Sequence, residues 1–400
     1  MNRVFLPIFI SAYLFIQTIM YAIFALIGLN EGQYNSYIYL AMSSVAVIIA
    51  LIQLINQRKI KINTLFGIAI CLLIAIHHYI TVQTKNPSLN INYFFVWGFV
   101  TLLLFGTVER TSITASVKYI EIVNLIQSIA AMIVTIRFFA LGNRIVNDLS
   151  FGGETYNTIS YVSSTSVGLF LYFLYFCNPV LRFRFFNKPF CRFVYWVLIV
   201  LSTITTFLSG GRGGAVLIIL YILVFIWHFN KTSANINKRI IVNALLIGVG
   251  ICFVYVAISN DALQSSLSRT FSYITRTGFD FTQTSYRNQV YTSAINSIKE
   301  RVLLGYGPLN YPDGIYPHNY FLELLLSGGI VYLIIGSFII IRVIRRAVVS
   351  FRYNDERLLM AFVFLSTIVM LMFSGSFYLN VRFWATTTYF LCLFKENYQW

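Results

Sequence analysis

The chain has 400 residues, of which 58% are hydrophobic and only 10% are charged. Because soluble domains carry about 25% charged residues, this composition excludes an ordinary soluble protein and predicts an all-α, polytopic integral membrane protein. The formal net charge of +16 is interpreted as basic loops facing the cytoplasm and anionic lipid, so no nucleic-acid partner is expected.

Apolar runs of roughly 17 to 25 residues, long enough to cross a bilayer, recur along the whole chain. They predict a bundle of about twelve transmembrane helices and one integral membrane domain over residues 1–400. The first run is too long for a cleavable signal core, and the last is short. The predicted spans are Val4–Leu29, Ser36–Asn56, Ile62–Val82, Ile91–Val108, Tyr119–Leu141, Thr158–Cys177, Phe193–Leu208, Gly214–Phe229, Ile240–Ser259, Asn319–Ile341, Leu358–Ser374 and Phe383–Phe394.

Most basic residues lie in alternate connections between these spans. Short cytoplasmic loops carry the excess of Lys and Arg, so both termini are predicted to be cytoplasmic. The basic residues of these connections are Arg58, Lys59 and Lys61; Arg110 and Lys118; Arg182, Arg184, Lys188 and Arg192; Lys231, Lys238 and Arg239; and Arg342, Arg345, Arg346, Arg352 and Arg357.

The connection 260–317, between the ninth and tenth predicted spans, is too polar to cross the membrane and is expected outside the cytoplasm. Within it, "SYRNQVYTSAINSIKERV" has the period of an amphipathic helix, with Arg287 near its start. The apolar positions on its predicted face are Val290, Ala294, Ile298 and Val302.

Five further basic residues lie at or near span ends that this topology places outside. Arginine on that side runs against the usual bias, so these residues are either interfacial anchors or ligands of an anionic group. They are Lys85, Arg137, Arg144, Arg212 and Arg382.

Arg212 lies in "SGGRGG", a tight connection between the seventh and eighth predicted spans. Such a turn can hold a phosphate through backbone N–H groups, the guanidinium and the N-terminus of the next helix. The alternative is a glycine-rich turn with one interfacial arginine.

His318 lies in "YPHN", at the expected start of the tenth span, with Asn319 beside it and Glu323 about one turn on. A helix N-terminus disfavours added positive charge, so the imidazole is expected in the neutral form that a general base needs. An isolated histidine there is more often an interfacial side chain, and the adjacent His77 and His78 point to different helix faces.

The predicted topology delivers Arg212, Arg287 and His318 to the same membrane surface, with Arg137 and Arg382 as further candidates. Two arginines and a neutral base could hold a lipid-linked pyrophosphate and deprotonate an incoming hydroxyl. Five scattered cysteines without a CxxC pair predict neither a metal site nor a disulfide framework.

Together, "SGGRGGAVL", "YRNQVYTSAINSIKERVLLGYGP" and "PHNYFLELLLSGGIVYLI" resemble the family of bacterial O-antigen polymerases and O-antigen ligases. The resemblance covers roughly residues 200–340; the first half of the chain matches only in its number of spans. "GGRGG" departs from the hydroxyl residue that many relatives have directly before the arginine.

The resemblance implies a metal-independent membrane glycosyltransferase without a cofactor, which uses a glycan on undecaprenyl pyrophosphate at the periplasmic face of the inner membrane. It implies that Arg212 and Arg287 bind the pyrophosphate and that His318 orients or deprotonates the attacking hydroxyl. Asn319 and Glu323 would support His318 or bind acceptor hydroxyls.

A polymerase, whose acceptor is a second lipid-linked repeat unit, is favoured over a ligase, whose acceptor is the lipid A core. The resemblance also implies a chain-length regulator protein as a partner. From another class, a flippase for the same lipid-linked oligosaccharide stays open, although transporters usually place charges near the bilayer midplane and contain internal repeats.

Overall fold

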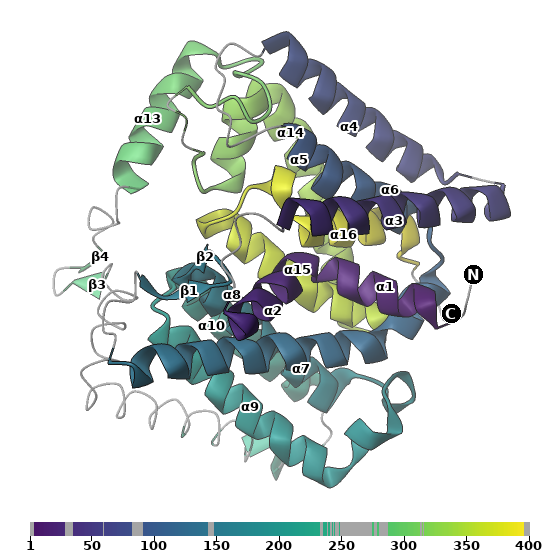
Figure 1. The fold of residues 1–400 in the computed structure, drawn as a ribbon, viewed down its shortest axis with the longest axis vertical. Helices are drawn as coiled ribbons and strands as arrows, with labels where there is room; N and C mark the ends of the chain where they lie inside the picture. Colours follow the sequence, from purple (N-terminus) through teal and green to yellow (C-terminus); the bar gives the residue numbers. More distant parts are fainter. Residues whose placement is uncertain are drawn as a thin grey trace. The chain divides into compact units, whose positions relative to one another are not determined.

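The computed structural model describes residues 4–28, 35–58, 60–81, 91–142, 148–232, 235–237, 239–240, 242, 244, 248, 274–275, 278–279, 287–312, 314 and 316–395. The chain divides into two compact units, and each is described by itself. Unit 1 comprises Met1–Gln17, Gln33–Ile120 and Thr284–Trp400, and unit 2 comprises Thr18–Gly32 and Glu121–Gln283. Figure 1 labels the helices.

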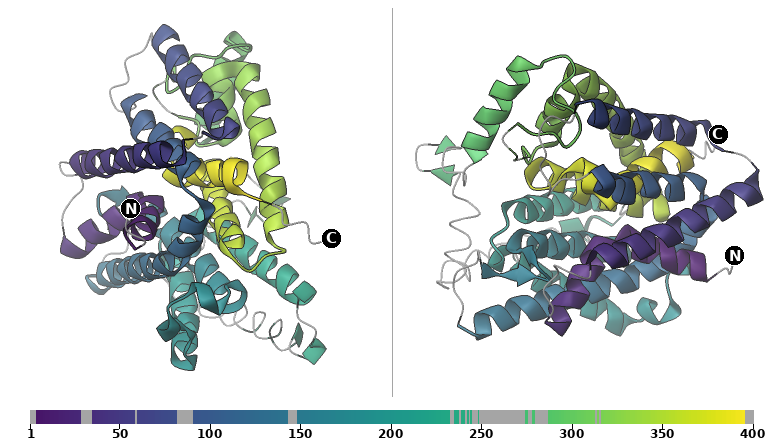
Figure 2. Two further views of the ribbon diagram at one scale, coloured as in Figure 1. Left: turned by 90° about the vertical axis from the view of Figure 1, so that its right-hand side faces the viewer. Right: turned by 45° about the horizontal axis from the view of Figure 1, so that its top comes forward.

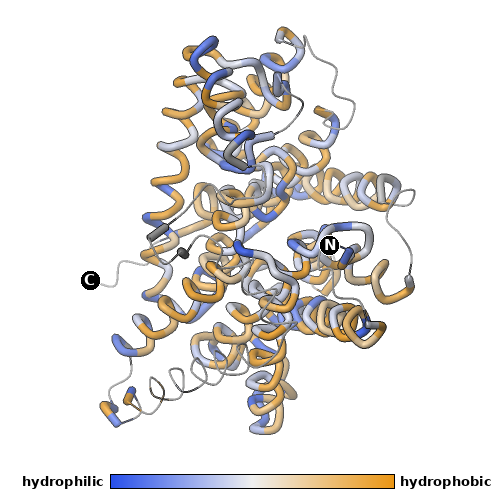
Figure 3. The backbone as a smooth tube through the Cα atoms, turned by 90° about the vertical axis from the view of Figure 1, so that its left-hand side faces the viewer, coloured by the Kyte–Doolittle hydropathy of each residue, from blue (hydrophilic) through white to orange (hydrophobic). Residues whose placement is uncertain are grey.

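The predicted all-α membrane fold is confirmed. Among the described residues, eight helices are long and apolar enough to cross a membrane, and hydrophobic residues predominate along the helices (Figure 3). These helices are α3 (Asn35–Gln57), α4 (Ile62–Thr81), α7 (Arg110–Ala140), α8 (Tyr156–Leu171) continued by the π-turn η4 (Tyr172–Phe176), α9 (Pro189–Leu208), α10 (Arg212–Thr232), α14 (Tyr320–Ser350) and α15 (Glu356–Phe373).

The first predicted span, Val4–Leu29, is not one straight helix. It forms α1 (Phe5–Leu14) and α2 (Ile16–Ile27), which are bent by 79°. The backbone of Phe15 leaves the helical region between them, with φ −112° and ψ 18°. Hydropathy alone could not reveal this break, because the apolar run continues through it.

Two other spans are shorter than the rest. Residues Ile91–Thr107 form α5 (Ile91–Phe94), the π-turn η2 (Phe95–Phe99) and α6 (Val100–Thr107). The last predicted span forms α16 (Val381–Thr388) and the π-turn η8 (Tyr389–Leu393). Most of the predicted span Ile240–Ser259 lies outside the described residues.

Helix α7 is 31 residues long, which corresponds to about 46 Å and exceeds a hydrocarbon core of roughly 30 Å. Helix α14 also has 31 residues, but non-helical backbone angles at Gly328 and Gly329 divide it into two parts. Each helix is longer than its predicted span at the end that carries Lys and Arg. Helix α7 begins earlier, with Arg110–Lys118, and α14 ends later, with Arg342–Ser350. Hydropathy marks where a helix leaves the apolar layer, not where its backbone hydrogen bonds end. Figure 2 shows α14 in two further views.

In unit 2, α8 packs against both α9 and α10. Within Tyr156–Phe176, 89% of the most apolar 18-residue stretch is buried. Small residues allow this close packing. A Cβ atom added to Gly168 of α8 would lie 2.3 Å from the ring of Tyr221 on α10. The two-residue strands β1 (Ser150–Phe151) and β2 (Glu154–Thr155) form an antiparallel hairpin just before α8.

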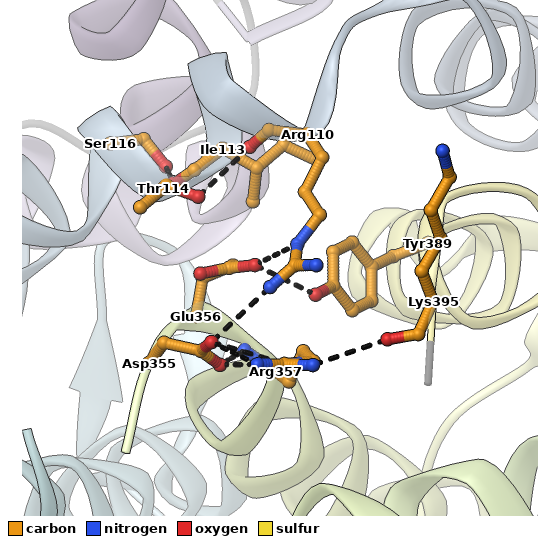
Figure 4. Close-up of polar contacts among 9 residues, drawn as sticks. All are labelled: Arg110, Ile113, Thr114, Ser116, Asp355, Glu356, Arg357, Tyr389 and Lys395. Atoms are coloured by element: carbon orange, nitrogen blue, oxygen red, sulfur yellow. Dashed lines mark hydrogen bonds and ion pairs between the residues drawn. The ribbon is translucent and has the colours of Figure 1, made fainter. Parts of the chain in front are cut away.

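Unit 1 contains a charged cluster where α7 and α15 begin (Figure 4). The Arg110 guanidinium donates to Glu356 and, at 3.2 Å, to Asp355. Arg357 donates to Asp355 and to the backbone carbonyl of Lys395. The cluster therefore joins the start of α7, the start of α15 and the chain just after η8.

Candidate functional site

His318 lies directly before the N-cap of α14 and has a left-handed backbone conformation, with φ 51°. This conformation is uncommon for residues other than glycine, and such residues gather at functional sites because the surrounding structure must hold them there. The side chain is half-buried, and its Nδ1 atom lies 3.4 Å from the backbone carbonyl oxygen of Ser374.

Tyr316 also contacts the histidine. Its ring centroid lies 4.0 Å from that of His318, and its hydroxyl donates a 2.5 Å hydrogen bond to the same Ser374 carbonyl. A carbonyl oxygen only accepts, so the contact favours the tautomer with the proton on Nδ1, in which Nε2 is the acceptor nitrogen of the ring.

Asn319 is the N-cap of α14. Its side-chain oxygen accepts hydrogen bonds from the backbone N–H groups of Phe321 and Leu322, at 3.0 and 3.2 Å. These N–H groups have no partner within the helix, which explains the preference for asparagine at such positions. Asn319 thus fixes where α14 begins, and thereby where His318 lies.

Glu323 is 1% exposed, and both of its oxygens accept hydrogen bonds. Oε1 accepts from the hydroxyls of Tyr311, at 2.7 Å, and Ser376. Oε2 accepts from the backbone N–H of Phe377 at 3.1 Å. Burial, together with the nearby Glu323 charge, raises the pKa of Tyr311 well above its ordinary value, so this hydroxyl stays a donor. Glu323 therefore ties the loop before α14 to the loop after α15.

The "SGG" motif forms a break within α14. Gly328 and Gly329 have non-helical backbone angles, and the carbonyls of Leu326 and Ser327 accept from the N–H groups of Tyr306 and Gly307, at 2.7 and 2.9 Å. Carbonyls released by the break therefore bind the "GYG" segment of the preceding loop.

The loop 307–310 also docks on α4. His78 Nδ1 lies 2.6 Å from the Pro308 carbonyl oxygen, and the Asn310 side chain donates to the Thr81 hydroxyl at 3.3 Å. On the neighbouring face, His77 Nδ1 lies 3.1 Å from the Tyr332 hydroxyl of α14. The two histidines have different partners, as their helical spacing indicates. The role of His78 in holding the loop was not apparent from the sequence, because α4 lies more than 200 residues before it.

The predicted amphipathic helix is present as α13 (Arg287–Glu300), and Arg287 is its first residue. Ala294 and Ile298 of its apolar face pack in a cluster with Tyr311 and Leu326. The helix that carries Arg287 therefore rests on the same loop and the same helix that position His318.

Arg382, in the first turn of α16, is 5% exposed, and its guanidinium lies 3.5 Å from the Met370 sulfur. Helix α16 packs against α15. The structure thus places Arg382 in unit 1 with His318, Asn319, Glu323 and Arg287, buried against the end of α15.

Arg212 and Arg137 belong to unit 2. Arg212 is the half-buried first residue of α10, and Arg137 is exposed in the last turn of α7. The glycines beside Arg212 are explained by packing against α8, because Cβ atoms on Gly213 and Gly214 would lie 1.8 Å from the Tyr161 hydroxyl and 2.1 Å from the Ser160 hydroxyl. That Arg212 meets His318 stays a prediction.

A scan against protein families matches residues 197–335 to the family described as O-antigen ligase. The matched segment contains α10, α13 and the first half of α14, and with them Arg212, Arg287 and His318. A search of curated proteins found no match.

Proposed function

We propose, from the match of residues 197–335 to the family described as O-antigen ligase, that the chain is an inner-membrane glycosyltransferase acting on undecaprenyl-pyrophosphate-linked glycan. It joins the glycan to a hydroxyl of a lipid-linked repeat unit, as an O-antigen polymerase does. The observation that carries the proposal is the placement of His318 at the start of α14, where its ring contacts the Ser374 carbonyl oxygen and the Tyr316 ring.

In the proposed reaction, the acceptor hydroxyl oxygen attacks the anomeric carbon of the donor. The new C–O bond forms as the bond to the pyrophosphate oxygen breaks, so direct displacement inverts the anomeric configuration. Nε2 of His318 accepts the hydroxyl proton, and the leaving pyrophosphate takes the bonding electrons. Arg212 and Arg287 stabilise its growing negative charge. No step of this reaction requires a metal or a cofactor.

The remaining residues have supporting roles in this proposal. Asn319 and Glu323 position His318 through the start of α14 and the two loops that Glu323 joins, rather than by touching the substrate. Arg137 and Arg382 are proposed to add positive charge for the anionic donor. The periplasmic orientation of the site and a chain-length regulator as partner belong to the same proposal.

A ligase is the second candidate, because the family that matches is described as O-antigen ligase. The two activities share the donor and differ in the acceptor, which is the lipid A core for a ligase. Surface polysaccharide from a deletion strain separates them. Loss of a polymerase leaves single capped repeat units, whereas loss of a ligase leaves long chains on undecaprenyl pyrophosphate.

The site is tested in the same strain complemented with His318→Ala, Arg212→Ala or Arg287→Ala, at equal protein levels in the membrane. We expect each substitution to reproduce the deletion phenotype. Val302→Ala, an exposed position just after α13, is the control and should restore the wild-type ladder. Normal ladders from all three site substitutions would contradict the proposed site.

A further inference from the structure

Two adjacent leucines just after α13 are largely uncovered. Leu303 is 69% exposed and Leu304 is 63% exposed. Single apolar residues on a surface are common, whereas an apolar patch that continues from one element to the next marks contact with a partner or a membrane. What surrounds the two leucines therefore decides whether they have a role.

The leucines lie on a short turn that is bound to α14 on both sides. Before them, the carbonyl of Val302 accepts from the N–H group of Ile330 at 2.9 Å. After them, the N–H group of Tyr306 donates to the carbonyl of Leu326 at 2.7 Å. The exposure of the two leucines is therefore fixed by hydrogen bonds to α14 and does not come from a loose loop.

The turn meets α14 where an exposed apolar face of that helix begins. Ile330 is the first exposed apolar residue after the break, and the face continues through Ile334, Phe338 and Ile341. Residues three or four positions apart lie on one side of a helix, and α14 is long and apolar enough to cross a membrane. Lipid chains therefore cover this face. The two leucines lie at the end of the face that is remote from the arginines after Ile341.

Basic and aromatic side chains flank the two leucines. Lys299 and Arg301 are exposed just before them, and the guanidinium carbon of Arg301 lies 4.6 Å from the ring centroid of Tyr306, just after them. Tyrosine and long basic side chains gather at the level of lipid headgroups, where their apolar parts lie against acyl chains and their polar ends reach phosphates and water. This arrangement matches the boundary between headgroups and acyl chains.

We propose that Leu303 and Leu304 insert into the bilayer leaflet beside the break in α14, so that the end of α13 rests on the membrane surface. Phospholipid is the partner, because the leucines continue the lipid-covered face of α14 and cations flank them. The insertion fixes one end of the helix that begins with Arg287. It depends on neither the donor nor the acceptor, so it can hold or fail independently of the proposed function.

The test uses purified protein in phospholipid nanodiscs, with native cysteines replaced by serine and one labelled cysteine in each variant. An environment-sensitive fluorophore is attached to Leu303→Cys, Leu304→Cys or Asn296→Cys, and Asn296 is an exposed position on α13. Lipids with a nitroxide near the top of the acyl chain should remove most of the fluorescence at the two leucine positions and little at Asn296. Weak and equal quenching at all three positions would overturn the inference.

Trypsin cleavage after Arg301 provides a second measurement without a label. In Leu303→Ser/Leu304→Ser the apolar contacts with lipid are lost, so cleavage in nanodiscs should be faster by about ten- to a hundredfold. The matched control Leu303→Met/Leu304→Met stays apolar and should be cleaved at the wild-type rate. A wild-type rate in the serine variant would contradict insertion.

A second copy of the chain is the other occupant that could cover the leucines. In membranes, Leu303→Cys would then form a disulfide-linked dimer, and the lipid quencher would not reach the same position. We expect no such dimer. Its formation together with weak quenching would overturn the inference.

Discussion

His318 has a left-handed backbone conformation, and its ring is held by Ser374 and Tyr316. One substitution can keep the backbone conformation while removing the imidazole. Asparagine tolerates the left-handed region at least as readily as histidine does, but it has no titratable nitrogen. His318→Asn is therefore expected to keep the fold and the membrane level of the protein while lowering the rate of glycan transfer by about 10²- to 10⁴-fold. Steady-state transfer with purified protein measures the effect. Activity close to wild type in this variant would mean that His318 is not the base.

Glu323 is expected to stabilise the site through its hydrogen bonds. Both carboxylate oxygens of Glu323 accept hydrogen bonds, from Tyr311, Ser376 and the Phe377 backbone. In Glu323→Gln an NH₂ group takes the place of one oxygen, so at least one of these hydrogen bonds is lost because two donors then face each other. The free energy of unfolding should fall by about 1–3 kcal/mol. Glu300→Gln is the matched control, because Glu300 is exposed and accepts from the Tyr306 hydroxyl at 2.7 Å. Thermal unfolding in detergent compares the two, and equal melting temperatures would contradict this role.

At the scale of elements, the break in α14 holds the loop that follows α13. Gly329 has φ 60°, and a Cβ atom there would lie 2.3 Å from the Leu303 backbone carbonyl. Gly329→Ala therefore forces the loop off the helix and should destabilise the protein by at least about 1–3 kcal/mol. Limited proteolysis should cut the 301–307 loop faster.

Gly375→Ala provides a control for that experiment. Its nearest neighbours are the side chains of Leu371 and Met370, 3.3 Å from the added Cβ atom, and both can move slightly. We expect a proteolysis pattern like that of wild type. If Gly329→Ala is cut no faster than Gly375→Ala, the loop does not depend on the break.

The cluster around Arg110 ties α7 to α15. The side chain of Glu356 is 1% exposed, and the side chain of Arg110 is 26% exposed. Arg110→Met therefore leaves the buried Glu356 carboxylate without its main partner. The expected loss of stability is about 3 kcal/mol. The double variant Arg110→Met/Glu356→Gln should recover part of it. A double-mutant cycle on the unfolding free energy measures this coupling, and strictly additive losses would show that the pair does not interact.

The sequence predicted the helices well and their ends and breaks less well. Apolar length located α4, α9 and α10 to within a few residues, because a span must match the bilayer. It missed the bend at Phe15 and the break at Gly328–Gly329, since both lie inside continuous apolar runs. The contact of His318 with Ser374 and that of His78 with Pro308 could not be predicted either, because both form only through tertiary packing.

At the scale of the whole molecule, the predicted orientation can be tested at two exposed positions. Val180 is 86% exposed in the basic connection between α8 and α9, and Pro312 is exposed in the loop before His318. The excess of Lys and Arg beside Val180 predicts that this connection is cytoplasmic. The same reasoning places Pro312, with His318, on the opposite side.

Single cysteines at these positions, in a protein whose native cysteines are replaced by serine, report sidedness through a membrane-impermeant maleimide. Pro312→Cys should react in intact spheroplasts, and Val180→Cys only after the membrane is permeabilised. The donor glycan is used outside the cytoplasm in the proposed reaction, so the His318 loop must be accessible there. Labelling of Val180→Cys but not Pro312→Cys in intact spheroplasts would invert the topology and remove the site from its substrate.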